Sequence, residues 1–147
     1  MVRSRFGNWC GYAGVPPGHP WYQSDYNDVD VSVHGGLTYA EFCDETGGPI
    51  CHVAKPGEPA RVWWLGFDCG HAMDYAPGLA AITRKALEAS KDSGARLLLD
   101  SRRYEPYDHE SAILAGPFEM RDVYRTATYV RAEVDGLAKQ IIEAGKC

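Results

Sequence analysis

Alternation of apolar and polar residues along the first half of the chain predicts a β-sheet. Residues 29–33 alternate strictly and predict a half-buried strand, whereas 61–67 contain a continuous apolar run that predicts a strand covered on both faces. Further strands are predicted at 8–15, 37–42 and 50–53, each bounded by proline or glycine on at least one side. Together they predict a mainly antiparallel sheet of four to five strands.

Apolar residues at helical spacing predict two helices in the second half. Residues 79–92 alternate leucine, isoleucine and alanine with charged side chains at this spacing, and Ser93-Gly94 ends the pattern. A longer stripe near the C-terminus comprises Val123, Ala127, Val130, Val134, Leu137 and Ile141. The predicted fold class is therefore α+β, with the sheet packed against these two helices, one of them at the C-terminus.

The chain length of 147 residues suits a single α+β domain, 1–147, which can bury about 68–70% of its unfolded surface. Charged residues and tyrosines interrupt the pattern between Arg96 and Pro117. We therefore interpret this stretch as an irregular insertion.

The charge, the length of the apolar runs and the cysteines of the chain limit the kinds of partner and compartment that we expect. The formal charge of −5 argues against a long nucleic acid, which would require a basic stripe. No apolar run approaches the ~20 residues of a membrane span, so we expect a soluble protein. Five cysteines without a CxxC pair or a signal peptide favour reduced thiols in a cytoplasm.

A glycine turn after the predicted strand 29–33 carries the first candidate ligand-binding groups. Its sequence is His34-Gly35-Gly36-Leu37-Thr38. A histidine, glycine N–H groups and a threonine hydroxyl suit a phosphate, although a tight turn without a ligand explains the same glycines. A phosphoesterase with two His-x-Thr motifs loses support, because the spacing differs and there is no second copy.

Polar side chains also follow the apolar run 61–67. Asp68-x-x-His71-x-x-Asp74 has the residue types of a metal or acid–base site. Two alternatives explain the same residues. One is a hydrogen-bonded loop in which Asp68 caps a turn, and the other is a pocket that binds a polar ligand without catalysing a reaction. A thiol nucleophile at Cys69 beside His71 is a further alternative.

Aromatic side chains concentrate in the first half of the chain. Many belong in a core, because aromatic residues bury large areas. Trp21 and Tyr22 follow a proline-rich loop beside His19, and Tyr26 comes shortly after. This segment is a candidate platform for stacking a nucleobase, a contact worth about 1–3 kcal/mol per base.

Several short motifs are distributed along most of the chain. They are Gly11-Tyr12, Pro17-Gly18-His19-Pro20, Asp25-Tyr26, Val33-His34-Gly35-Gly36-Leu37-Thr38-Tyr39, Gly66-Phe67-Asp68-Cys69-Gly70-His71 and Tyr124-Arg125-Thr126. This combination resembles a widespread family of small tailed-phage proteins. The stretch 79–117 departs most from the family pattern, so the resemblance implies a variable insertion at about 79–117. The resemblance implies a bacteriophage protein acting on host defence in the host cytoplasm, and one large class of such proteins sequesters nucleotide signals.

The function expected from these observations is immune evasion by an anti-CBASS sponge. It would bind a cyclic dinucleotide such as cGAMP without catalysis, metal or cofactor, at the strand ends or at a subunit interface of a homo-oligomer. The residues expected to bind it are His19, Trp21, Tyr22, Tyr26, His34, Gly35, Gly36, Thr38, Asp68, His71 and Arg125. The alternatives are a metal- or histidine-dependent phosphodiesterase using His34, Asp68, His71 and Asp74, and an inhibitor that binds a host defence enzyme through the loop 16–28.

Overall fold

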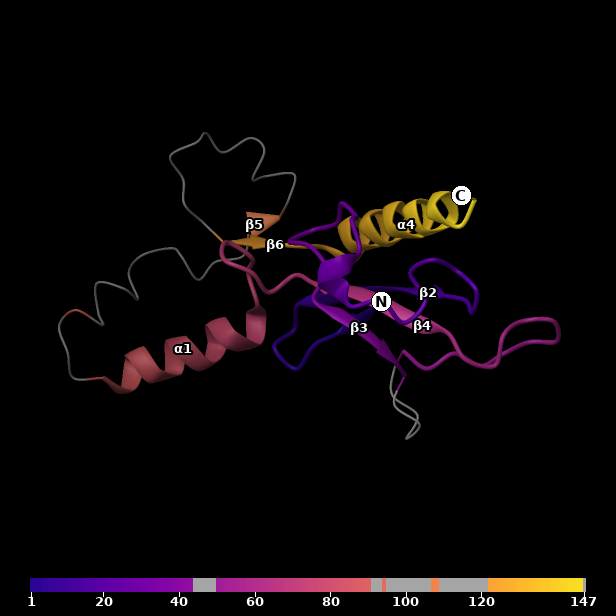
Figure 1. Cartoon of the computed structure of the whole chain (residues 1–147). Helices are drawn as coiled ribbons and strands as arrows, with labels where there is room; N and C mark the ends of the chain where they lie inside the picture. The colour runs from indigo at the N-terminus through magenta and orange to yellow at the C-terminus, as the bar shows by residue number, and fades with distance from the viewer. Residues whose placement is uncertain (44–49, 91–93, 95–106, 109–121, 147) are drawn as a thin grey trace. The chain divides into compact units, whose positions relative to one another are not determined.

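The described part of the chain has an α+β fold, with a four-stranded antiparallel sheet and two α-helices (Figure 1). The computed structural model describes residues 1–43, 50–90, 94, 107–108 and 122–146. The elements are β1 (Val2–Arg3), β2 (Trp9–Val15), η1 (Tyr26–Asp28), β3 (Tyr39–Phe42), β4 (Trp63–Asp68), α1 (Pro77–Ala89), β5 (Tyr107–Asp108), β6 (Val123–Tyr124) and α4 (Ala127–Ala144). The predicted fold class is thus confirmed.

The sheet has the order β1-β2-β4-β3, so β2 and β4 form its centre. Leu65 and Phe67 of β4 are almost fully buried, as the continuous apolar run predicts. Phe67 lies opposite Gly11 of β2, where a Cβ would stand 2.4 Å from the phenylalanine ring and 2.7 Å from Val134 of α4. A glycine at this position therefore lets the helix and the aromatic ring approach the strand closely.

The C-terminal helix α4 provides the other half of this core. Val130, Leu137 and Ile141 are its buried residues, so the stripe seen in the sequence packs inward. Val123, the first residue of the predicted stripe, belongs to the short strand β6 instead. In the part of the chain that the structure describes, no helix is long and apolar enough to cross a lipid bilayer.

Contacts within the chain group it into two compact units. Unit 1 comprises Met1–Val2, Cys10–Asp68 and Val130–Cys147, and unit 2 comprises Arg3–Trp9 and Cys69–Tyr129. The expectation of a single domain over 1–147 stays a prediction.

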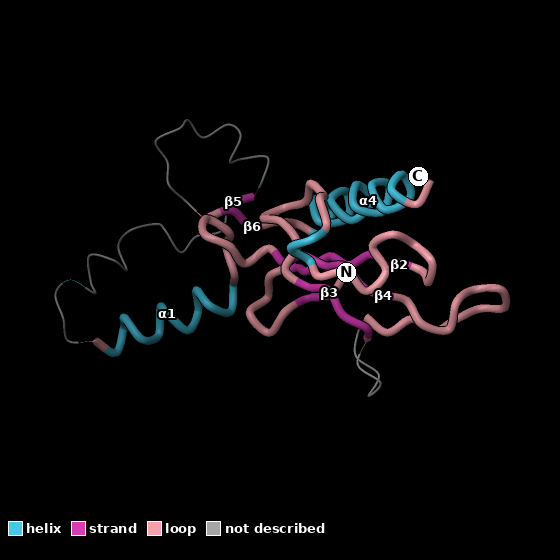
Figure 2. Tube along the Cα trace, in the orientation of Figure 1, coloured by secondary structure: helices cyan, strands magenta, loops and turns pink. Residues whose placement is uncertain are grey.

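Two predicted strands are wrong. Residues 29–33 lie in the loop between η1 and β3 (Figure 2), and 50–53 also contain no strand. In the first of these segments, the backbone of Ser32 bonds to a side chain rather than to a neighbouring strand. The Gln140 carboxamide accepts from Ser32 N at 2.8 Å and donates to Ser32 O at 2.9 Å, so one amide satisfies the donor and the acceptor that a strand would have paired.

The predicted helix at 79–92 is present as α1, which begins at Pro77 and ends at Ala89. A proline in the first turn suits a helix start, because its missing N–H would have no partner there. None of the α1 residues is buried, although the apolar positions predict a face packed inward. Most of the remainder of the expected insertion at 79–117 lies outside the described residues.

The expectation that all cysteines are reduced is wrong for two of them. Cys43 and Cys51 form a disulfide with their Cα atoms 5.1 Å apart, a separation typical of such bonds. The spacing of eight residues gave no signal for this pair. Cys10 and Cys69 are reduced thiols, and Cys147 lies outside the described part of the chain.

Candidate functional site

The turn at His34-Gly35-Gly36 is anchored to helix α4. Gly35 and Gly36 both have positive φ, 66° and 83°, which accounts for the two glycines. The N–H of Gly36 donates to Val33 O at 3.1 Å, and that of His34 donates to the Glu133 carboxylate at 2.8 Å. The Gly36 N–H, one of the two glycine N–H groups expected to hold a phosphate, is therefore used by the fold, and the Glu133 carboxylate bound to His34 N would repel a phosphate.

The predicted site residues Thr38 and Asp68 are brought together. The Thr38 hydroxyl donates to Asp68 Oδ2 at 3.0 Å, and Thr38 N donates to Gly66 O at 2.8 Å. Asp68 is the last residue of β4 and lies opposite Cys10 of β2. This pair fixes the start of β3 against the end of β4.

Tyr12 and Cys10 occupy the same face of β2, next to this pair. Burial, Cys10 and Asp68 all raise the pKa of Tyr12, to about 12, with burial the largest cause. Burial and then Asp68 raise the pKa of the Cys10 thiol, which therefore lacks the thiolate character of a nucleophile. The Tyr12 ring lies edge-on to that of Tyr39, with centroids 5.4 Å apart.

The pKa of Tyr12 predicts a loss of stability in strong alkali. Because the folded-state pKa lies above the ordinary value of 10, its contribution is complete below pH 10 and is lost as the pH rises through about 12. The free energy of unfolding should fall over this interval and fall less in Tyr12→Phe. Urea titrations of both proteins at several pH values measure this, and identical pH slopes would contradict it.

The ring nitrogens of His19 both serve the fold. Nδ1 accepts from Trp21 N at 3.0 Å, and Nε2 donates to Ile141 O at 2.7 Å, which corresponds to the neutral Nε2–H tautomer. The His19 and Trp21 rings meet at 5.5 Å between centroids. His19 therefore offers its ring face, rather than a donor nitrogen, to a ligand.

The other aromatic residues of the predicted platform lie separately. Tyr22 contacts Phe42, which in turn packs against Trp63 at 4.9 Å between ring centroids. Tyr26 lies in η1 and is 39% exposed. Only His19 and Trp21 of the platform residues contact each other through their rings among the contacts described.

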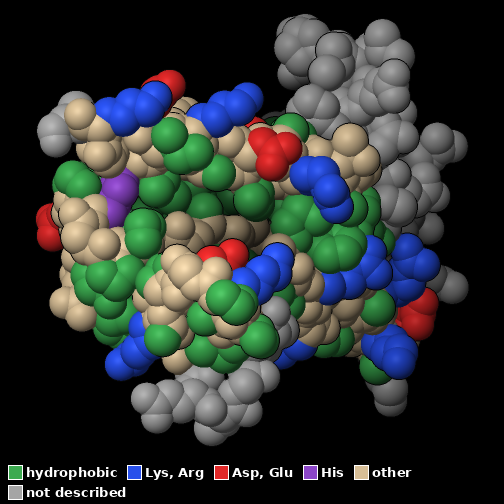
Figure 3. Space-filling view, turned by 90° about the vertical axis from the view of Figure 1, so that its right-hand side faces the viewer, with side chains coloured by type: hydrophobic (Ala, Val, Ile, Leu, Met, Phe, Trp, Pro, Cys, Tyr) green, Lys and Arg blue, Asp and Glu red, His purple; other side chains and the backbone are tan. Residues whose placement is uncertain are grey.

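Unit 1 contains a pocket of about 480 Å³ that the sequence did not reveal. Its lining residues are Tyr12, Ala13, Gly14, Pro16, His19, Trp64, Val134, Ala138, Ile141, Ile142 and Gly145. The lining is mostly apolar, and the face in Figure 3 shows hydrophobic side chains gathered around a hollow. Small residues at Gly14, Ala138 and Gly145 leave the space. The buried indole N–H of Trp64 has no hydrogen-bond partner in the described structure.

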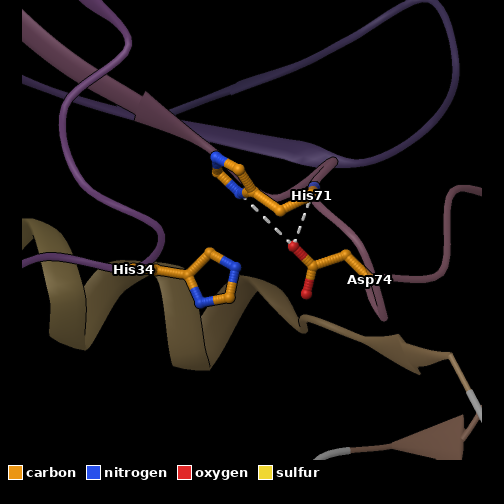
Figure 4. A group of neighbouring side chains, drawn as sticks. All are labelled: His34, His71 and Asp74. Carbon is orange, nitrogen blue, oxygen red and sulfur yellow. Dashed lines mark hydrogen bonds and ion pairs between the residues drawn. The ribbon is translucent and has the colours of Figure 1, made fainter.

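In unit 2, Asp74 is the centre of a hydrogen-bonded cluster. Its side chain is 2% exposed; Oδ1 accepts from Arg125 Nε at 2.8 Å and Oδ2 accepts from His71 N at 3.1 Å. The His71 ring nitrogen Nδ1 lies 3.6 Å from the same oxygen (Figure 4). Arg125, predicted as a phosphate ligand, pairs through Nε with this buried carboxylate.

This arrangement bears on the predicted metal alternative. Both carboxylate oxygens of Asp74 already accept hydrogen bonds, and an arginine supplies the compensating charge. His71 and Asp74 belong to unit 2, whereas His34 and Asp68 belong to unit 1 and are described there. The hydrogen bonds of His71 and Asp74 in unit 2 are those of a hydrogen-bonded loop, one of the alternatives that the sequence left open for this motif.

Comparisons with known proteins add no relative. No protein-family model, no curated protein and no solved structure matches the chain.

Proposed function

We propose that this chain binds a nucleotide without transforming it, with the nucleobase in the pocket of unit 1. The pocket carries the proposal. Its aromatic residues Tyr12, His19 and Trp64 line an otherwise aliphatic space of about 480 Å³. Planar heteroaromatic rings bind well among such side chains, because stacking and burial of apolar area act together.

The polar atoms of a base suit this pocket as well. The buried Trp64 indole N–H has no hydrogen-bond partner among the described residues, which costs about 1–3 kcal/mol in a protein interior. Purines and pyrimidines carry ring nitrogens and carbonyl oxygens that accept hydrogen bonds. A small shift of the indole toward a bound base would satisfy this donor.

Phosphates would lie at the rim rather than at the glycine turn. Lys139 is exposed one helical turn before Ile142, which lines the pocket, and exposed Lys146 directly follows Gly145, which also lines it. Glu143 stands beside Ile142 in the chain and opposes an anion there. Local lysines, rather than the overall charge of −5, supply the attraction.

Binding is favoured over hydrolysis by the state of the candidate catalytic groups. Asp68 accepts from the Thr38 hydroxyl. Both carboxylate oxygens of Asp74 accept hydrogen bonds, one of them from Arg125. With the phage-family resemblance, this supports sequestration of an immune signal, a cyclic dinucleotide such as cGAMP in CBASS defence.

Filling the pocket tests the proposal. Ala138→Phe places a ring in the pocket and should weaken cGAMP binding at least about tenfold, or ~1.4 kcal/mol. Ala132→Phe adds the same ring at an exposed position of α4 and should bind normally. Glu143→Gln should bind more tightly, because it removes an opposing charge. Calorimetric titration measures all three.

The fate of the ligand separates the remaining alternatives. Mass analysis after denaturation should recover intact cGAMP. Recovery of a hydrolysed product would support the phosphodiesterase alternative. Absence of binding by the parent protein, or equal binding by Ala138→Phe and Ala132→Phe, would overturn the proposed site.

A further inference from the structure

A rigid turn in unit 2 presents a strained methionine. Asp74 N donates to His71 O at 3.0 Å and closes a four-residue turn. Met73, its third residue, has φ 75°, the left-handed region in which glycine is favoured at this position of a type II turn. A residue with a side chain is strained in this conformation, because its Cβ lies too close to neighbouring backbone atoms.

Hydrogen bonds on both sides of Met73 hold this conformation. Its carbonyl accepts from Val123 N at 2.8 Å, and Tyr75 N donates to Val123 O at 2.9 Å. The neighbouring Asp74 carboxylate accepts from His71 N and from Arg125. These contacts involve the backbone and Asp74 and leave the Met73 side chain 59% exposed.

The methionine borders a pocket of about 340 Å³. Leu79, at the start of α1, forms another apolar part of its lining and is 51% exposed. Asp122 lines the same pocket, and no ion pair or hydrogen bond of its carboxylate occurs among the described residues. The pocket therefore joins exposed apolar side chains to one uncompensated carboxylate, since Asp74 is neutralised by Arg125.

We infer that this pocket receives one arginine or lysine side chain from a partner protein. The methylene stem would pack against Met73 and Leu79, as long basic side chains do on apolar surfaces, and the charged head would donate to Asp122. Methionine suits such a contact because its flexible, polarizable side chain adapts to a bound group. The strain at Met73 is then the consequence of placing an apolar side chain at the rim of this pocket.

Methyl spectroscopy can observe this pocket directly. The chain has three methionines, so ¹³C-methyl labelling gives at most three signals, and Met73→Gly identifies the one that belongs to residue 73. The probes are capped heptapeptides of glycine and serine with one central arginine, lysine, leucine or glutamate. The arginine and lysine peptides should shift the Met73 signal, and the glutamate peptide should not.

Variants separate recognition from folding. Asp122→Asn should weaken binding of the arginine peptide at least about tenfold. Its affinity for the leucine peptide should be unchanged. Met73→Gly should have a melting temperature no lower than that of the parent, because it relieves the strain. Calorimetric titration of this variant should nevertheless show loss of binding to the arginine peptide. Free L-arginine should bind more weakly than the capped peptide, because its charged α-ammonium and α-carboxylate groups are costly to remove from water at the apolar rim.

Equal Met73 shifts with arginine and glutamate peptides, or unchanged arginine binding in Asp122→Asn, would overturn the inference. Tighter binding of free L-arginine would point to a small-molecule site and likewise overturn it. None of these measurements involves a nucleotide or unit 1, so their failure leaves the proposed function untouched.

Discussion

Arg125→Met should destabilise the protein by about 3–5 kcal/mol, since it removes the compensating charge of a buried carboxylate. The Asp74 side chain is 2% exposed and accepts from Arg125 Nε at 2.8 Å, and the arginine itself is 19% exposed. Asp74 also accepts from His71 N in the strained turn. Losing the arginine therefore leaves a buried charge and loosens the attachment of this turn to β6. Urea denaturation of both proteins measures the change.

Three controls identify the cause of this loss. Arg125→Lys keeps the charge but not the planar guanidinium, so its cost should be smaller. The double variant Asp74→Asn with Arg125→Met removes both charges and should recover part of the stability. Arg84→Met changes an exposed arginine of α1. Its free energy of unfolding should lie within about ±0.5 kcal/mol of that of the parent. A loss below about 1 kcal/mol in Arg125→Met would show that the pair contributes little.

The role of Arg125 shows what sequence reasoning could and could not supply. Its residue type predicted an anion partner, and the structure provides one in Asp74. The partner is 51 residues away in the chain, and no periodic pattern connects the two positions. Sequence alone therefore could not distinguish a bound phosphate from a buried carboxylate.

The strongest patterns predicted the elements best. The apolar run at β4 and the stripe of α4 correspond to buried residues, because burial depends directly on the spacing of apolar side chains. The alternation at 29–33 is equally regular and yet contains no strand. There, Gln140 of α4 pairs the Ser32 backbone, a side-chain substitute for strand pairing that local alternation cannot predict.

No sequence motif indicates the pocket of unit 1, because small residues, rather than residues with recognisable chemistry, create its space. Gly14 and Ala138 contribute no large side chain, and the space arises only when β2 and α4 pack together. The candidate residues found by sequence were those with recognisable chemistry, such as His34 and Asp68. Those groups are partly or wholly engaged by the fold, so chemical type identified hydrogen-bond partners more readily than a binding site.

Leu137→Ala should cost about 2–5 kcal/mol, as expected for a large-to-small change in a core. Leu137 is completely buried on α4, together with Val130 and, nearly so, Ile141. The matched control is Leu79→Ala, since Leu79 is 51% exposed near the start of α1 and should lose less than about 1 kcal/mol. Denaturant titration of both variants gives the difference. Equal losses, or a negligible loss at Leu137, would show that the α4 stripe does not contribute to the core in this way.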